Sequence, residues 1–169
     1  MRSTAGIVRV GVFLAILMSL PAHAENARKQ EENTGIETLS PALRTLLTKE
    51  MLAIQTGMMA VIPAYASGNW NEIEAIAHHI KHSYILKQSL TDEQSHELHS
   101  SLPASFIEQD QQFHYYSGML EHAASMRKPE LVGFYYSKLN EACINCHSQF
   151  ATHRFPALTP EKDTGEHSH

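Results

Sequence analysis

Apolar side chains recur at spacings of three and four residues along most of the chain from residue 40 to residue 156, which is the periodicity of one buried helix face. The first such segment begins at Ser40 and Pro41, an N-cap followed by proline at the first helical position. We expect this helix to end near Ser67 and Gly68. Its predicted inward face consists of Leu43, Leu47, Met51, Ile54, Met58, Val61 and Tyr65.

A second helix is expected to begin after Asn69, because Asn69 and Glu72 can together satisfy the first free backbone amides. Its inward residues are Ile73, Ile76, Ile80 and Tyr84, and its end is predicted between residues 87 and 90. The polar, histidine-bearing stretch from 91 to 102 then indicates a long connection, with one short helix capped by Thr91.

Two further helices complete the pattern. The third runs from Pro103 to Arg127 and Lys128, and the fourth runs from Pro129 to Pro156. Predicted inward residues of the third helix are Phe106, Phe113, Met119, Leu120 and Ala124, and those of the fourth are Leu131, Tyr135, Leu139, Ala142, Cys146 and Phe150. With no alternating strand pattern and no repeat, the chain is predicted to be all-α, an antiparallel four-helix bundle over residues 39–156. We expect a mobile leader at 25–38 and a disordered tail at 157–169.

The N-terminal stretch has the pattern of an export signal. Arg2 and Arg9 precede an apolar run of 11 residues from Val10 to Leu20, and a small-x-small triplet ends at Ala24. The run is shorter than the ~20 residues that span a bilayer. Residues 1–24 are therefore predicted to be a signal peptide cleaved after Ala24, which delivers the protein to the periplasm without stable membrane insertion; an uncleaved anchor is the alternative.

Charge and length narrow the choice of partners. Residues 25–169 hold 11 basic and 18 acidic residues, a formal charge of −7 with histidine neutral. Nucleic acid is therefore not an expected partner. An acidic surface favours basic redox proteins through electrostatic steering at low salt.

The only two cysteines, Cys143 and Cys146, are followed at once by His147. Cys-x-x-Cys-His is the attachment motif of c-type haem, and on a helix the three side chains share one face. A redox dithiol is less consistent with this position, because no strand precedes the motif. A zinc site is also less consistent, because it would have to recruit scattered histidines to complete its four ligands. One covalently bound haem c is the expected cofactor.

The position of this motif near the end of the fourth helix resembles the cytochrome c′ family, the class II c-type cytochromes, which include low-spin cytochrome c-556-like members. The resemblance covers residues 40 to 156 and implies that Cys143 and Cys146 form the thioethers and that His147 is the proximal iron ligand. It also implies that the distal side faces the first helix, where Met51 is the expected sixth ligand and Met58 its competitor. Where the family commonly has a basic residue, four positions after the proximal histidine, this chain has Ala151, with Arg154 three residues later.

These features predict a periplasmic one-electron carrier rather than an enzyme, with redox proteins as partners. The alternative is a five-coordinate haem protein that binds a small gas, nitric oxide or carbon monoxide, at an open distal site. A homodimer through the first two helices is a further implication of the resemblance. Other candidate metal ligands are the histidines of the second and third helices, His78, His79, His82, His114 and His122, although surface histidines are more often only solvated.

Overall fold

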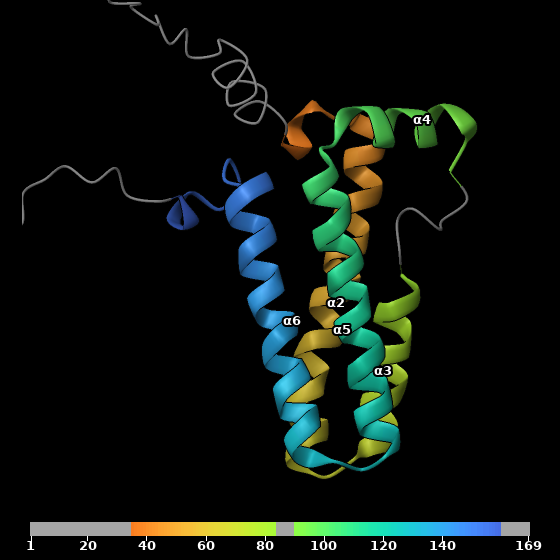
Figure 1. The fold of residues 1–169 in the computed structure, drawn as a ribbon, viewed down its shortest axis with the longest axis vertical. Helices are drawn as coiled ribbons and strands as arrows, with labels where there is room; N and C mark the ends of the chain where they lie inside the picture. The colour runs from red at the N-terminus through yellow and green to blue at the C-terminus, as the bar shows by residue number, and fades with distance from the viewer. Residues whose placement is uncertain (1–34, 84–89, 160–169) are drawn as a thin grey trace, which may run out of the picture.

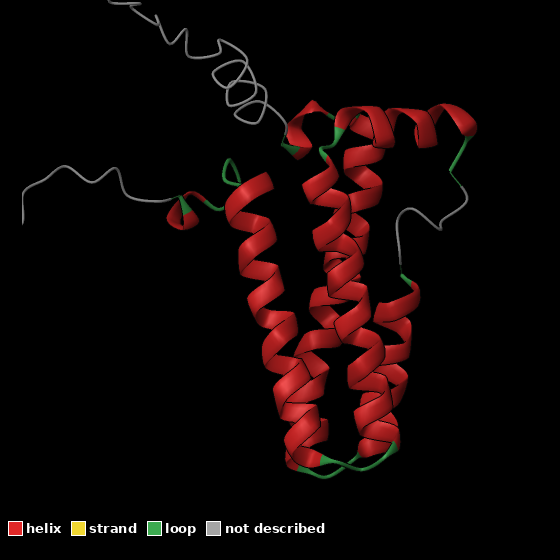
Figure 2. Ribbon diagram, viewed as in Figure 1, coloured by secondary structure: helices red, strands yellow, loops and turns green. Residues whose placement is uncertain are grey.

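The computed structural model describes residues 35–83 and 90–159, and these residues are all-helical with no strand among them (Figures 1 and 2). The elements in chain order are η1 Ile36–Thr38, α2 Pro41–Ala66, α3 Trp70–His82, α4 Asp92–Ser101, α5 Ala104–Ser125, α6 Pro129–Phe150 and η3 Pro156–Leu158. Helices α2, α3, α5 and α6 run alternately up and down, and α4 lies across one end (Figure 1). The predicted helical bundle is therefore confirmed. The predicted signal peptide and most of the predicted leader and tail lie outside the described residues.

The helix starts follow local side-chain chemistry. The Ser40 hydroxyl accepts a hydrogen bond from the Leu43 amide at the start of α2, and the Asn69 side chain accepts one from the Glu72 amide at the start of α3. Thr91 opens α4 with a capping box, in which the backbone amide of Thr91 also donates to Gln94. All three caps were predicted from the sequence. The second helix was predicted to be longer, but α3 ends at His82, and α6 ends at Phe150 before the predicted Pro156.

The C-terminal ends of α2 and α5 have the same backbone geometry, although their residues differ. In both, the amides of the two residues after the C-cap bond back to carbonyls of the last turn, at 2.8 to 3.1 Å, which is the Schellman arrangement. The residue in the left-handed conformation is Gly68 after α2 (φ +69°) and Arg127 after α5 (φ +54°). Glycine adopts this conformation without strain, whereas arginine does not.

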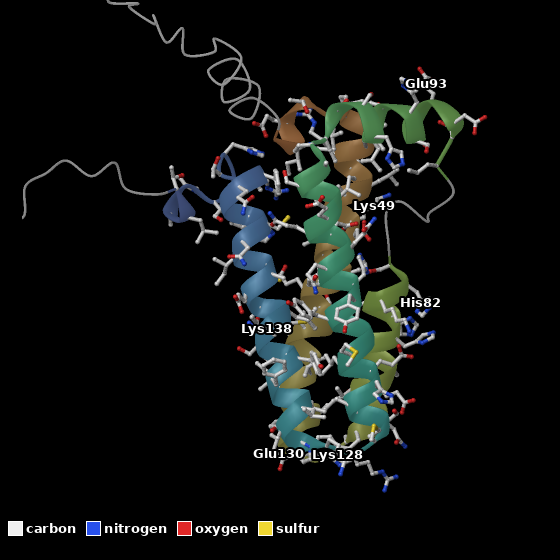
Figure 3. The ribbon with its side chains drawn as sticks, viewed as in Figure 1. Lys49, His82, Glu93, Lys128, Glu130 and Lys138 are labelled. Carbon is white, nitrogen blue, oxygen red and sulfur yellow. The ribbon has the colours of Figure 1, made fainter. Side chains whose placement is uncertain are left out.

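Two apolar clusters fill the interior. The turn-end core lies toward the α2–α3 and α5–α6 connections and contains the buried residues Ile54, Met58, Val61, Ala64, Ile73, Ala77, Ile80, Leu120, Ala123, Ala124, Val132 and Leu139. The α4-end core contains Leu39, Leu43, Leu47, Leu98, Leu102, Phe106 and Phe150. Charged side chains such as Lys49, Glu93 and Lys128 lie on the outside (Figure 3).

Among the described residues, the predicted inward faces are correct at most positions and wrong at three; the predicted inward residue Tyr84 lies outside the described residues. Met51, Tyr65 and Leu131 are 38%, 40% and 46% exposed. The corresponding buried positions on α2 and α6 are occupied by Glu50 and Val132, each one residue away from the predicted apolar residue. Positions one apart fit a three-or-four spacing equally well, so the pattern alone does not decide between them.

Side-chain hydrogen bonds to carbonyls join the helices. The buried Ser117 hydroxyl of α5 donates to the Ala77 carbonyl of α3 at 2.8 Å. The Tyr136 hydroxyl of α6 donates to the Met58 carbonyl of α2 at 3.2 Å. Each bond fixes how far one helix is displaced along its neighbour. No helix of the described segments is both long and apolar enough to cross a membrane.

Candidate functional site

The cysteine pair lies in the last two turns of α6, at the same end of the bundle as α4 (Figure 1). Cys143 and Cys146 are free thiols, each partly buried. Cys146 packs against the α4-end core. His147, four residues after Cys143, is also partly buried on the same side of the helix. The structure therefore brings together the three residues predicted from the motif.

Both thiols lie in surroundings that disfavour the thiolate. Burial raises the pKa of Cys146 to about 12, and the nearby charges of Asp110 and Cys143 contribute to the rise. Burial also raises the pKa of Cys143. A dithiol redox centre needs the opposite, a thiol whose pKa is lowered so that the thiolate can attack. This environment argues against that alternative.

The imidazole of His147 is held by the segment that follows α6. The backbone turns back on itself here, since the amides of Arg154 and Phe155 both donate to the Ala151 carbonyl, at 2.9 and 3.1 Å. The Phe155 ring consequently stacks on the His147 ring, with centroids 4.2 Å apart and planes 10° apart. Burial lowers the pKa of His147, and the charge of Arg154 lowers it further. The neutral imidazole, the form that can bind a metal, is thereby favoured.

Arg154 supplies a cation near the His147 imidazole. The residue four positions after His147 is the uncharged Ala151. Because the turn after α6 folds back, the guanidinium of Arg154 acts on His147 from a position three residues later.

Three polar side chains with little exposure lie on α2 and α5 between the residues of the two apolar clusters. They are Glu50 of α2, 4% exposed, together with Asp110 and His114 of α5. His114 is 7% exposed, and its Nε2 lies 3.6 Å from Asp110 Oδ1. Asp110 Oδ2 is buried and makes no hydrogen bond within the described residues. We call these three residues the buried polar layer.

Sequence reasoning identified only His114 in this layer. Phe106, Asp110 and His114 follow one another at intervals of four residues on the inward side of α5, and that spacing could have revealed Asp110. Glu50 carried no comparable signal, because an apolar Met51 stands beside it.

The predicted distal residues lie in different surroundings. Met51 is 38% exposed, whereas Met58 is 7% exposed within the turn-end core. His122 is exposed on α5, unlike the buried His114. As an iron ligand, Met51 stays a prediction.

Comparison with known proteins gives no identification: no protein-family model, characterised protein or solved structure matches the chain. The site consists of two partly buried thiols beside a stacked imidazole on the last turns of one helix.

Proposed function

We propose that this protein is a periplasmic monohaem c-type cytochrome that carries one electron, with haem c attached through Cys143 and Cys146 and its iron bound by His147. The observation that carries the proposal is the joint placement of these three side chains on one face at the end of α6. The Cys-x-x-Cys-His spacing is the one that this attachment requires.

The donor set fits the group. Two thiols three residues apart can each form a thioether, and the lowered pKa of His147 keeps its imidazole available as a ligand. The packing of Cys146 against leucine and phenylalanine side chains provides an apolar surface for a flat macrocycle. In the bound state the haem iron supplies a one-electron couple between ferric and ferrous forms.

The chain's own residues would position and tune that group. Phe155 stacks on His147 and so restricts rotation of the imidazole. The Arg154 cation lies on the His147 side, whereas the carboxylate of Asp110 acts on Cys146. The reduction potential of a haem iron depends on the charges around it and on how deeply it is buried.

Met51 is the sixth ligand in this proposal, as the resemblance implies. Absorption spectra of the ferric and ferrous protein test it, because six-coordinate iron with a methionine ligand is low-spin and binds carbon monoxide poorly. Met51→Ala should then give high-spin iron that takes up carbon monoxide rapidly, with a lower reduction potential because a thioether favours the ferrous state. The matched control is Met58→Ala, which should leave the spectrum unchanged while it destabilises the fold by about 2–5 kcal/mol.

A five-coordinate gas-binding protein is the second candidate, and the exposure of Met51 favours it. Met58 is buried in the turn-end core, where it packs against apolar side chains. The buried polar layer places an imidazole and carboxylates in the interior of the bundle. Wild-type protein that is already high-spin and binds carbon monoxide would overturn the carrier proposal in favour of this one. A low-spin spectrum that persists in both methionine variants would instead identify a histidine ligand, with His114 the first to replace.

Export and partners belong to the same proposal. The export signal supports a periplasmic location, and the charge of −7 over residues 25–169 supports basic redox proteins as partners. Helix α2 exposes Leu52, Met59 and Ile62 at 58%, 67% and 59%, a surface that supports the implied homodimer. Sedimentation analysis of Met59→Lys tests this point, since the substitution should turn a dimer into a monomer.

A further inference from the structure

A second cluster of metal-binding side chains lies on the outer face of α3, separate from the cysteine pair. His78 and His82 are one helical turn apart, and their ring centroids lie 4.1 Å from each other with planes 37° apart. Both residues are exposed to solvent, the His78 side chain by 56%. Neighbouring His79 presents its ring to His78 edge-on at 6.3 Å and does not join this pair.

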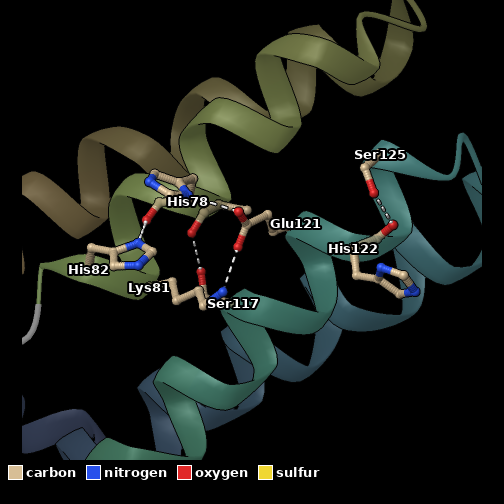
Figure 4. A network of polar contacts seen from close by, with 8 residues as sticks. His78, Lys81, His82, Ser117, Glu121, His122 and Ser125 are labelled. Carbon is tan, nitrogen blue, oxygen red and sulfur yellow. Dashed lines mark hydrogen bonds and ion pairs between the residues drawn. The ribbon is translucent and has the colours of Figure 1, made fainter.

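Each of the two rings makes a hydrogen bond through its Nδ1 atom (Figure 4). His78 Nδ1 lies 2.8 Å from Glu121 Oε1 on α5, and His82 Nδ1 lies 2.7 Å from the His78 carbonyl oxygen. An ionised carboxylate and a backbone carbonyl can only accept hydrogen bonds, so each Nδ1 must carry the proton. In the neutral rings, each Nε2 therefore keeps its lone pair for a metal.

The carboxylate in this arrangement is itself held in its ionised form. Burial alone would raise the pKa of Glu121, but hydrogen bonds from His78 and Lys81 lower it below its ordinary value. Lys81 Nζ lies 3.0 Å from Glu121 Oε2, which leaves Oε1 for His78. A carboxylate behind a metal-binding histidine is a recurrent arrangement in metal sites, since it fixes the ring and increases its basicity.

We propose that His78 and His82 form a surface site for a divalent first-row transition ion, bound by both Nε2 atoms with Glu121 positioning His78. Histidines at positions i and i+4 share one helix face and can bind a single ion, and the centroids of these two rings lie 4.1 Å apart. No group of three or more histidine, cysteine, aspartate or glutamate side chains within 35–83 and 90–159 is placed to hold a metal, so the proposed site takes two ligands from the described residues. Imidazole ligands and the general affinity order select Cu²⁺ most strongly, followed by Ni²⁺ and Zn²⁺.

The test is a Cu²⁺ titration of the purified full-length mature protein in neutral buffer, followed by calorimetry and electron paramagnetic resonance. Wild-type protein should bind one more Cu²⁺ than His78→Ala or His82→Ala, with nitrogen hyperfine structure that each substitution removes. Glu121→Gln should weaken this binding by about 10- to 100-fold, and His79→Ala, the matched control, should leave it unchanged.

Binding that is equal in wild type and in His78→Ala would overturn the proposal, because the ion would then occupy other histidines of the chain. An equal loss in His79→Ala would overturn it too, since the geometry assigns no role to that ring. The three histidine side chains are exposed and that of Glu121 is 20% exposed, so circular dichroism at neutral pH should show that each variant keeps its helical content. The site depends on neither haem nor its iron ligands, and its failure would leave the proposed function untouched.

Discussion

Cys146 should react slowly with a disulfide reagent in the folded, haem-free protein. Burial raises its pKa from 9.0 to about 12, so at pH 8 its thiolate is ~1,000-fold scarcer than that of an ordinary thiol. A more basic thiolate is also a better nucleophile, which recovers ~15- to 30-fold of that deficit. The expected net effect is a rate ~30- to 60-fold below that of the same thiol in unfolded protein.

The assay uses residues 25–169 produced without haem attachment and carrying Cys143→Ala, so that one thiol reports. Its reaction with an aromatic disulfide reagent is followed at pH 8 in buffer and in urea, with near-ultraviolet circular dichroism to establish that the protein in buffer is folded. Cys146→Ala serves as the matched variant for Cys143, whose pKa is also raised by burial. A folded protein whose Cys146 reacts as fast as in urea, or faster, would refute the reasoning and would favour a redox dithiol.

Two further predictions concern the scaffold. Arg127→Gly should stabilise the protein by about 0.5–1 kcal/mol, because removal of a left-handed strain of about 1–2 kcal/mol is partly offset by the freedom of glycine in the unfolded chain. The melting temperature should rise by about 2–3 °C. The control Arg127→Lys should leave it unchanged. A lower melting temperature in Arg127→Gly would contradict the proposed backbone strain at Arg127. Glu121→Gln should destabilise the protein more at pH 7 than at pH 3. Since the pKa of Glu121 is lowered on folding, its contribution to stability is present above 4.5 and is lost as the pH falls through the folded value. Urea unfolding at both pH values measures the difference, and equal losses would contradict it.

The helix starts could be predicted from the sequence because caps are local. Ser40, Asn69 and Thr91 each bond to an amide three residues away, and such contacts depend on nothing distant in the chain. The cysteine motif is equally local, which is why its three residues lie together on α6. Fold class followed from helical periodicity over long segments.

The remaining features depend on tertiary packing. Whether Glu50 or Met51 faces inward is decided by how α2 rotates against its neighbours, and the spacing of apolar residues permits either. Asp110 of α5 affects the pKa of Cys146 of α6 only because the two helices pack together. The pairing of His78 with Glu121 likewise joins residues of α3 and α5 that are far apart in the chain.

The measurement that tests the central claim most directly is the intact mass of the protein exported in a host that attaches c-type haem. The account predicts residues 25–169 plus one haem, a mass that survives denaturation and acid-acetone extraction, and its loss when Cys143 and Cys146 are both replaced by alanine. A wild-type mass without haem, with both thiols free or joined in a disulfide, would contradict the account, as would haem that stays bound to the double variant after extraction.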